Sequence, residues 1–369
     1  MRCVFHIRGH PNILSSHKNT LEFTKEPEVS KKGDCIVGIE SDFSKKELKQ
    51  LIKQHKLLRL TIKAGNLKDS INFIANPEFD DDKELVIRRS EFNSERTFGF
   101  RTDKASIDLN RKLIKRLQDP KTRAEIIIEP QIKLFIFDFD DTLEDFKECF
   151  EKTYVKISRL MEKKHGVPEK TAYKVLADVD RYFELKCVGG SPKWGDRHIW
   201  FDEFAKRTNI RLSKKEIKDL VVLYWDTVLK HAKQMPNAEK LLKYLQQRYL
   251  IALMSDTDGD LKVKMDRIRK VGLYDYFDLI TTSDMTGENK PSKKFYDLIL
   301  KKLKTSPEEC VMVGDKPQVD LKFAKELGMK TILVKHGIWL EHETGNKFDY
   351  VDHEIKDLKE IIDIVKEEF

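Results

Sequence analysis

Three aspartates lie within four positions of the sequence, directly behind an apolar run. The stretch LFIFDFDDTLEDF carries them at Asp138, Asp140 and Asp141. Carboxylates repel one another, so a chain gathers them at one point only where a cation offsets their charge. Asp138 and Asp140 are two residues apart and therefore share one side of an extended chain. The spacing indicates a site that binds a cation or moves protons.

Further polar residues follow later apolar runs. Ser255 and Asp256 follow YLIALM, Gly314 and Asp315 end and follow CVMVG, and Lys290 stands in the loop GENKPSKKF after FDLITT. In an open parallel sheet, ligands bind in a crevice at the carboxyl ends of the strands. Carboxylates, one hydroxyl and one ammonium at that edge suit a hard divalent cation and a phosphate group.

The elements that must position these residues follow the pattern of an α/β domain. From residue 132 on, continuous apolar runs alternate with amphipathic helical segments, as in a parallel sheet covered on both faces. Residues 146–249 between the first two strands have only helical patterns, which is far longer than a crossover requires. We therefore expect a domain over 131–369, with a core at 131–145 and 236–369 and a helical cap inserted at 146–235.

Residues 1–130 have a different pattern. Their apolar runs are short and typical of strands, and two helical segments interrupt them at 44–54 and 105–118. This predicts a mainly β, sandwich-like N-terminal domain over 1–130.

Taken together, the polar positions after the strands resemble the haloacid dehalogenase-like superfamily of phosphohydrolases. The resemblance covers residues 132–369, and the long helical insertion is similar to the cap that one branch of the family carries there. The four family motifs are met in order by Asp138, Asp140 and Thr142, by Ser255, by Lys290 and Pro291, and by Gly314, Asp315 and Asp320.

The resemblance implies a mechanism. Asp138 would attack phosphorus and form an aspartyl-phosphate that water hydrolyses. Asp140 would protonate the leaving oxygen and then deprotonate the water. Mg²⁺ would be held by Asp138, the backbone carbonyl of Asp140, and Asp315.

The other motif residues would serve the phosphate. Ser255 would donate a hydrogen bond to it, and Lys290 would offset the charge of the transition state. Asp320 would order the waters of the metal or orient Lys290. One departure from the family is Asp256, which stands where an asparagine is common.

The implied activity is a Mg²⁺-dependent hydrolase acting on a small phosphorylated metabolite. Within the cap, the segment CVGGSPKWGDRHIWFDEF offers Trp194 and Arg197 as residues for substrate specificity. The alternative for this segment is a helix whose core stripe is formed by Trp200, Phe201 and Phe204. A phosphotransferase or mutase would need the same core, whereas dehalogenation has no use for Asp140 or Asp315.

The N-terminal segment is similar to an archaeal family known as a domain of unknown function, which implies no activity. The formal net charge is +7, and roughly six of these charges lie in the first 130 residues, which favours a polyanionic partner. The alternative function is therefore a nucleic-acid-binding protein with an accessory phosphatase. Further ligand candidates in this segment are His10, His17, Asp34, Arg88, Arg89 and Arg96.

Composition narrows the cellular setting. The five cysteines form no Cys-x-x-Cys pair, so a disulfide framework or a structural zinc site is not expected. No apolar run has the length of a signal peptide or of a membrane span. We expect a cytoplasmic protein with no membrane partner.

Overall fold

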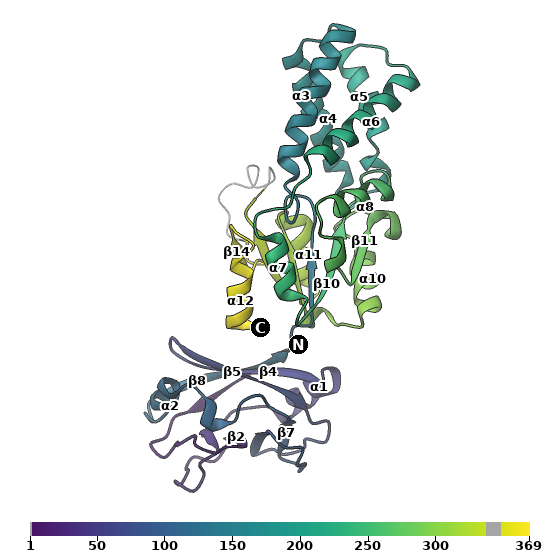
Figure 1. The fold of residues 1–369 in the computed structure, drawn as a ribbon. Helices are drawn as coiled ribbons and strands as arrows, with labels where there is room; N and C mark the ends of the chain where they lie inside the picture. Colours follow the sequence, from purple (N-terminus) through teal and green to yellow (C-terminus); the bar gives the residue numbers. More distant parts are fainter. Residues whose placement is uncertain (1, 337–347) are drawn as a thin grey trace. The chain divides into compact units, whose positions relative to one another are not determined.

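The computed structural model describes residues 2–336 and 348–369. The chain divides into two compact units, Met1–Gln131 and Ile132–Phe369, which are drawn in purple to blue and in teal to yellow in Figure 1.

The first unit is built on one mixed sheet of eight strands, in the order β1-β8-β4-β5-β7-β6-β2-β3. The pairs β2–β3 and β6–β7 are parallel and the others are antiparallel. This confirms the prediction of a strand-rich segment, and the strand pairing runs continuously through a single sheet. The strands are β1 (Cys3–Arg8), β2 (Thr20–Thr24), β3 (Ile36–Gly38), β4 (Leu57–Ala64), β5 (Leu67–Ala75), β6 (Glu84–Arg88), β7 (Thr97–Phe100) and β8 (Arg123–Pro130).

Alternation of side chains along these strands builds the core of the first unit. In β1, Cys3, Phe5 and Ile7 are buried whereas the residues between them are exposed, as expected for a strand with one face in a core. Two helices, α1 (Lys45–Gln54) and α2 (Arg111–Leu117), add their apolar faces to the same core. A short 3-10 turn, η1 (Ser106–Asp108), precedes α2.

The second unit contains a sheet of six parallel strands in the order β11-β10-β9-β12-β13-β14. The strand β9 is central, so the chain runs outward from it in both directions, and such a reversal of strand order opens a crevice at the carboxyl ends. The strands are β9 (Leu134–Phe137), β10 (Leu250–Ser255), β11 (Leu279–Thr282), β12 (Cys310–Gly314), β13 (Lys330–Val334) and β14 (His353–Ile355).

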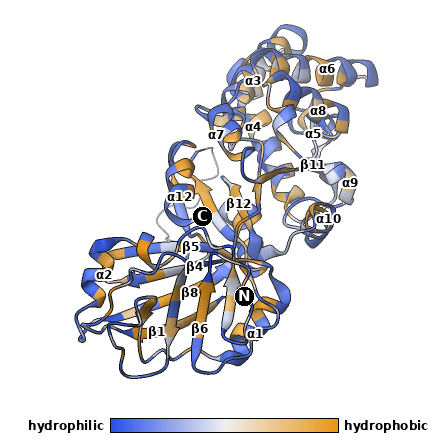
Figure 2. Cartoon of the chain, turned by 60° about the horizontal axis from the view of Figure 1, so that its bottom comes forward, coloured by the Kyte–Doolittle hydropathy of each residue, from blue (hydrophilic) through white to orange (hydrophobic). Residues whose placement is uncertain are grey.

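Both faces of this sheet are covered by helices. Phe135 and Phe137 of β9 pack with α7 (Ala238–Leu245), α8 (Leu261–Lys270) and α12 (Glu360–Glu368). Leu134 and Ile136, which point the other way, pack with α10 (Lys293–Leu303) and α11 (Lys322–Glu326). Burial on both faces explains why the strands are continuous apolar runs, which appear orange in β12 of Figure 2. The remaining short elements are η3 (Tyr274–Tyr276), α9 (Ser283–Thr286), η4 (Pro307–Glu309) and η5 (Pro317–Leu321).

Four helices form the module inserted between β9 and β10, which we call the cap. They have their own apolar core and stand away from the sheet in Figure 1. These are α3 (Phe146–His165), α4 (Glu169–Cys187), α5 (Arg197–Thr208) and α6 (Lys214–His231), with a 3-10 turn, η2 (Pro192–Gly195), before α5. The predicted α/β fold class with an inserted helical cap is confirmed.

Among the residues that the structure describes, no helix combines the length and the apolar character needed to cross a bilayer.

Because each unit has its own core, we expect the separate segments 1–131 and 132–369 each to unfold cooperatively. In the first segment, Leu60→Ala removes a fully buried side chain of β4 and should lower the free energy of unfolding by about 2–5 kcal/mol. Urea titration followed by circular dichroism measures this change. Lys63→Ala, at an exposed position of the same strand, is the control and should change stability by less than about 0.5 kcal/mol. A gradual, non-cooperative transition of the wild-type segment would contradict the prediction.

Candidate active site

Asp138 follows the central strand β9 and lies between two neighbouring strand ends. Phe137, the residue before it, pairs with Leu253 of β10 on one side and Val313 of β12 on the other. The backbone amide of Asp138 donates to the carbonyl of Val313 at 2.9 Å. This register brings the residues after β10 and β12 to the same edge as Asp138, because the strands are parallel.

Three carboxylates meet at this edge. One oxygen each of Asp138, Asp315 and Asp320 lies within 4.8 Å of the others, and all three side chains are buried. Burial raises the pKa of Asp315 well above its usual value against the opposing effect of Lys316, and the charge of Asp138 adds to the shift. Such a cluster is costly to keep ionised unless cations offset it.

Lys290 supplies one such cation. Its ammonium group donates to Asp138 Oδ1 and, at 2.8 Å, to Asp320 Oδ1. Burial would lower the pKa of Lys290, but Asp138 and then Asp320 outweigh it and raise that pKa well above the usual value. Lys290 therefore stays charged in a buried position between two carboxylates.

Asp320 is held on both of its oxygens. Oδ1 accepts from Lys290, and Oδ2 accepts from the backbone amide of Lys316 at 3.1 Å. Gly314 makes this approach possible, since a Cβ there would come within 2.5 Å of Asp320 Oδ2 and 2.7 Å of its Cβ. The presence of glycine at position 314 of the fourth motif is therefore explained by sterics, because a side chain there would collide with Asp320.

Ser255 ends β10 and is fully buried. Its hydroxyl donates to the carbonyl of Asp256 at 3.3 Å. Asp256 in turn accepts from the backbone amide of Lys290 at 2.9 Å, which links the second motif to the third. Burial raises the pKa of Asp256 to about 6, although Lys290 opposes the shift.

Asp140 lies in a second charged cluster beside the first. Lys264 of α8 donates to Asp140 Oδ2 at 2.7 Å, and Arg267 of the same helix donates to Asp140 Oδ1. Arg267 also pairs with Glu144 and donates to both oxygens of Asp258, at 2.9 and 2.8 Å. Lys264, Arg267 and Glu144 are fully buried.

This cluster sets the charge state of Asp140. Burial would raise its pKa, but Arg267 and then Lys264 outweigh burial and hold the pKa below its usual range. Glu144 shows the opposite balance, because burial raises its pKa to about 7 against the attraction of Arg267. In this arrangement Asp140 is ionised and its carboxylate is fully engaged.

The third aspartate of the opening stretch has a local role. Asp141 adopts a left-handed backbone with φ of 57°, and its Oδ1 accepts from the amides of Phe146 and Lys147 at 3.1 and 3.0 Å. A ring nitrogen of His336 lies within 4.8 Å of ligand atoms of Asp141 and Asp145. Because these two backbone amides already occupy Asp141 Oδ1, we interpret Asp141 as a residue that stabilises the start of α3 and not as a metal ligand.

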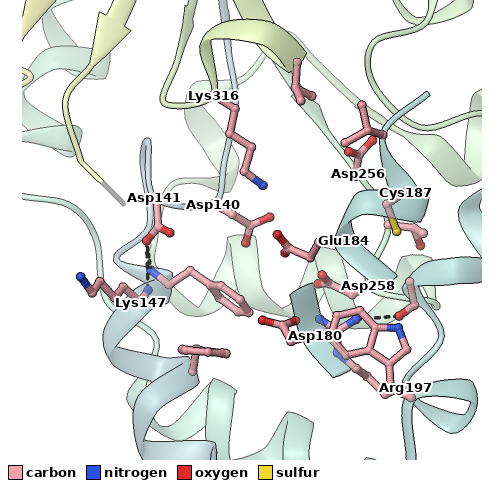
Figure 3. A pocket seen from close by; sticks show the side chains of 17 residues that line it. Asp140, Asp141, Lys147, Asp180, Glu184, Cys187, Arg197, Asp256, Asp258 and Lys316 are labelled. Atoms are coloured by element: carbon pink, nitrogen blue, oxygen red, sulfur yellow. Dashed lines mark hydrogen bonds between the residues drawn. The ribbon is translucent and has the colours of Figure 1, made fainter. Parts of the chain in front are cut away.

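A pocket opens between the cap and the carboxyl edge of the sheet. Figure 3 shows Asp140, Asp180, Glu184 and Asp258 directed into a common space, with Lys316 extending toward it from the sheet side. The described residues that line it are Asp140, Asp141, Phe146, Lys147, Phe150, Asp180, Glu184, Cys187, Val188, Gly195, Arg197, Trp200, Asp256, Thr257, Asp258, Lys316 and Val319. Asp140 and Asp256 connect this pocket to the motif residues.

The two cap residues singled out from the sequence occupy different places. Arg197 lines the pocket and lies 3.6 Å from the ring centre of Trp200. Trp194 stacks on Phe183 with ring centres 5.9 Å apart and is not among the lining residues. Trp200 and Phe204 are buried in the cap core, as expected for the core stripe of a helix, and the specificity role of Trp194 and Arg197 stays a prediction.

The residues present fit a divalent cation. Asp315 Oδ2 is buried and has no hydrogen-bond partner among the described residues. Together with Asp138, it forms a set of oxygen donors of the kind that Mg²⁺ prefers. A cation bound to this oxygen would satisfy it and reduce the repulsion between the two carboxylates.

Several charged residues of the site were not predicted from the motifs. Lys264 and Arg267 are three residues apart on the helix that follows Ser255, a spacing that places both on one face. Asp180 and Glu184 are four apart on α4 and share a face for the same reason. The spacing predicts that the two residues of each pair lie on one face of their helix. It does not predict that this face points toward the site.

The N-terminal candidates are engaged in local contacts. His10 lies 3.0 Å from Glu28, Arg89 pairs with Asp108 at 2.7 Å, and Arg96 pairs with Glu84 at 2.6 Å. Arg88 lies over the exposed ring of Phe92. Groups of three or more potential metal ligands occur, within the described ranges, only in the second unit.

Comparison with known proteins divides the chain at the same point as the two units of the structure. Residues 5–131 match a family described as a domain of unknown function (DUF371), and residues 132–328 match the haloacid dehalogenase-like hydrolase family. The glyceraldehyde 3-phosphate phosphatase of Pyrococcus furiosus is 30% identical over 241 residues, which cover 64% of this chain and 95% of that protein.

Two more comparisons concern the second unit. The ribulose-1,5-bisphosphate 5-phosphatase of Halopiger xanaduensis is 25% identical over 240 residues, covering 62% of this chain and 98% of that protein. The crystal structure of the HAD-hydrolase YfnB from Bacillus subtilis, bound to magnesium, is similar in fold, with a TM-score of 0.50 and 19% identity over 64% of this chain and 99% of that one. The chain thus belongs to the haloacid dehalogenase-like hydrolase family and is a phosphatase of that family.

Proposed function

We propose that this chain is a Mg²⁺-dependent phosphomonoesterase that hydrolyses a small phosphorylated metabolite through an aspartyl-phosphate on Asp138. The observation that carries the proposal is the buried contact between Asp138 and Lys290 beside Asp315 and Asp320. A nucleophile, a fixed cation and further carboxylates meet there at the carboxyl edge of a parallel sheet.

Asp138 is suited to act as the nucleophile. Its backbone is fixed by the hydrogen bond to Val313, and the ammonium group of Lys290 contacts its Oδ1 and holds the carboxylate at a defined position. When a phosphate replaces part of that contact, the same ammonium group offsets the charge that develops on the phosphoryl oxygens. Asp320 keeps Lys290 in place during the exchange. Ser255, at the end of the neighbouring strand β10, would donate its hydroxyl hydrogen to a phosphoryl oxygen.

Asp140 is the candidate for the acid and base steps. While it is ionised in its contacts with Lys264 and Arg267, it carries no proton to donate, and its low pKa makes it a weak base. Protonating the leaving oxygen therefore requires Asp140 to weaken those contacts, since its pKa rises as the two cations move away.

The cation would be held by Asp138, the backbone carbonyl of Asp140, and Asp315. When bound, Mg²⁺ supplies Lewis-acid polarisation of the phosphate. These residues would orient that cation, and Thr142 supports Asp315 by donating to its Oδ1 at 3.4 Å.

The substrate class rests on the relatives and on the cap. The relatives in Pyrococcus furiosus and Halopiger xanaduensis are named as phosphatases of a triose phosphate and of a pentulose bisphosphate. The pocket beneath the cap is bounded by Phe146, Phe150 and Trp200 as well as by charged groups, which supports a small, polar metabolite as the substrate.

Asp138→Asn should reduce phosphate release by at least about 10³-fold, because the amide is a poor nucleophile. Colorimetric detection of phosphate from a panel of small phosphate esters measures the loss. Asp202→Asn, at an exposed position of α5, is the matched control and should keep full activity. Equal rates for Asp138→Asn and the wild type would refute the nucleophilic role.

Chelation of divalent cations should abolish activity, and added Mg²⁺ should restore it. Asp315→Asn replaces one carboxylate of the cluster and should raise the Mg²⁺ concentration for half-maximal rate by at least about 10-fold. A titration of rate against Mg²⁺ for both proteins tests this. Activity that persists after exhaustive chelation would exclude the proposed cofactor.

Asp140→Asn should lower kcat by about 10²–10⁴-fold for an alkyl phosphate, whose leaving oxygen must be protonated. The loss in the first step should be smaller for p-nitrophenyl phosphate, because p-nitrophenolate leaves without a proton. Burst kinetics separate that step from hydrolysis of the intermediate. Equal losses in the first step for the two esters would argue that Asp140 does not act as the acid.

A further inference from the structure

The cap contributes an acidic pair to the pocket that the phosphate chemistry does not use. Asp180 and Glu184 are four residues apart on α4, so both side chains leave the same face of the helix. Both line the pocket, and Figure 3 shows them directed into the space beside Asp140. They lie on the cap side, where the leaving group of a phosphate ester would extend away from the sheet.

Glu184 is an available acceptor. No hydrogen bond or ion pair from another described residue holds its carboxylate, and its side chain is half-buried. Lys316 lines the same pocket and extends toward it from the sheet side. A ligand in the pocket therefore meets a carboxylate whose oxygens are open to it.

Asp180 adds a group that can donate as well as accept. It is buried, and the nearby Tyr154 hydroxyl contributes to its electrostatic surroundings. Burial and then the charge of Glu184 raise the pKa of Asp180 to about 8, against the attraction of Arg197. The raised pKa favours the protonated form of Asp180, which can donate a hydrogen bond beside the Glu184 side chain.

The neighbouring cation of the cap, Arg197, is held against aromatic rings. Arg197 is buried, donates to the carbonyl of Gly195 at 2.9 Å, and stacks over the rings of Trp200 and Tyr224. These contacts hold the guanidinium against the cap core. Its Nε is buried without a hydrogen-bond partner among the described residues, so the aromatic rings and the carbonyl of Gly195 fix its position in the pocket wall.

We infer that Glu184 and Asp180 recognise the leaving group, and that the pocket takes phosphate monoesters of uncharged, hydroxyl-bearing alcohols. Hydroxyl groups both donate and accept, which matches a carboxylate next to a carboxylic acid. An ester with a second carboxylate or phosphate would place like charges side by side in a partly desolvated space, and such contacts discriminate strongly. This inference rests on the proposed phosphomonoesterase activity and adds its specificity.

Two esters of nearly the same shape test the inference. Glycerol 3-phosphate and 3-phosphoglycerate differ in a hydroxymethyl group against a carboxylate at the far end. For the full-length wild type with Mg²⁺, kcat/KM should be at least about 30-fold higher for glycerol 3-phosphate. Acetyl phosphate, which carries no such end group, reports the phosphatase activity independently.

Variants of Glu184 separate recognition from a structural role. Glu184→Gln should lower the preference between the two esters by about 10-fold, mainly through a lower KM for 3-phosphoglycerate. Glu184→Lys should reverse the preference, which a loss of structure could not do. Asp180→Asn should also lower the preference. Asp178→Asn, at an exposed position of the same helix, is the control and should leave the preference unchanged.

Each result decides the matter. Hydrolysis of acetyl phosphate with equal kcat/KM for the two esters, or a preference for 3-phosphoglycerate, would overturn the specificity inference while the phosphatase proposal stands. A preference for glycerol 3-phosphate that Glu184→Lys fails to reverse would remove Glu184 from the role. No phosphate release from any ester or from acetyl phosphate would refute the proposed function, and the inference with it.

Discussion

The site depends on one constraint, which is the repulsion between buried carboxylates at the carboxyl ends of β9 and β12. Asp138, Asp315 and Asp320 lie within 4.8 Å of one another, and Lys290 is the cation that contacts two of them. When all three carboxylates are ionised, their charge exceeds that of Lys290, and a divalent cation would offset the excess. The parallel register of the sheet creates this excess, because it brings the strand ends together. The carboxyl edge of the sheet is therefore suited to bind a divalent cation in addition to Lys290, and these two positive charges together suit a phosphate.

The fold and the motif residues could be predicted because the signals for them are local. Continuous apolar runs mark β9, β10 and β12, and a polar residue directly after such a run must lie at the strand end. Asp138, Ser255 and Asp315 are placed by that rule alone. The cap was predictable as helical by its length and pattern, since residues 146–249 exceed what a crossover needs.

The second charged cluster could not be predicted, because it depends on how separate elements face one another. Lys264 and Arg267 read as ordinary basic residues of a charged helix until α8 packs beside Asp140 and Glu144. In the same way, the positive charge of the first unit suggested a basic surface, yet Arg8, Arg89, Arg96 and Arg101 all form ion pairs with nearby carboxylates. A count of charges shows neither the ion-pair partner of each side chain nor the direction in which that side chain points.

The two clusters explain how neighbouring aspartates can take different roles. Asp138 shares Lys290 with Asp320, so its charge is only partly offset. It is therefore suited to bind a divalent cation that arrives together with a phosphate. Asp140 is paired with two buried cations that Asp258 and Glu144 also contact, so its own charge is already offset. A carboxylate in that state has little attraction for a metal through its side chain, and its proton affinity depends on its distance from Lys264 and Arg267. Since Asp258 also lines the pocket beneath the cap, a ligand that contacts Asp258 would act on the same cations that set the proton affinity of Asp140.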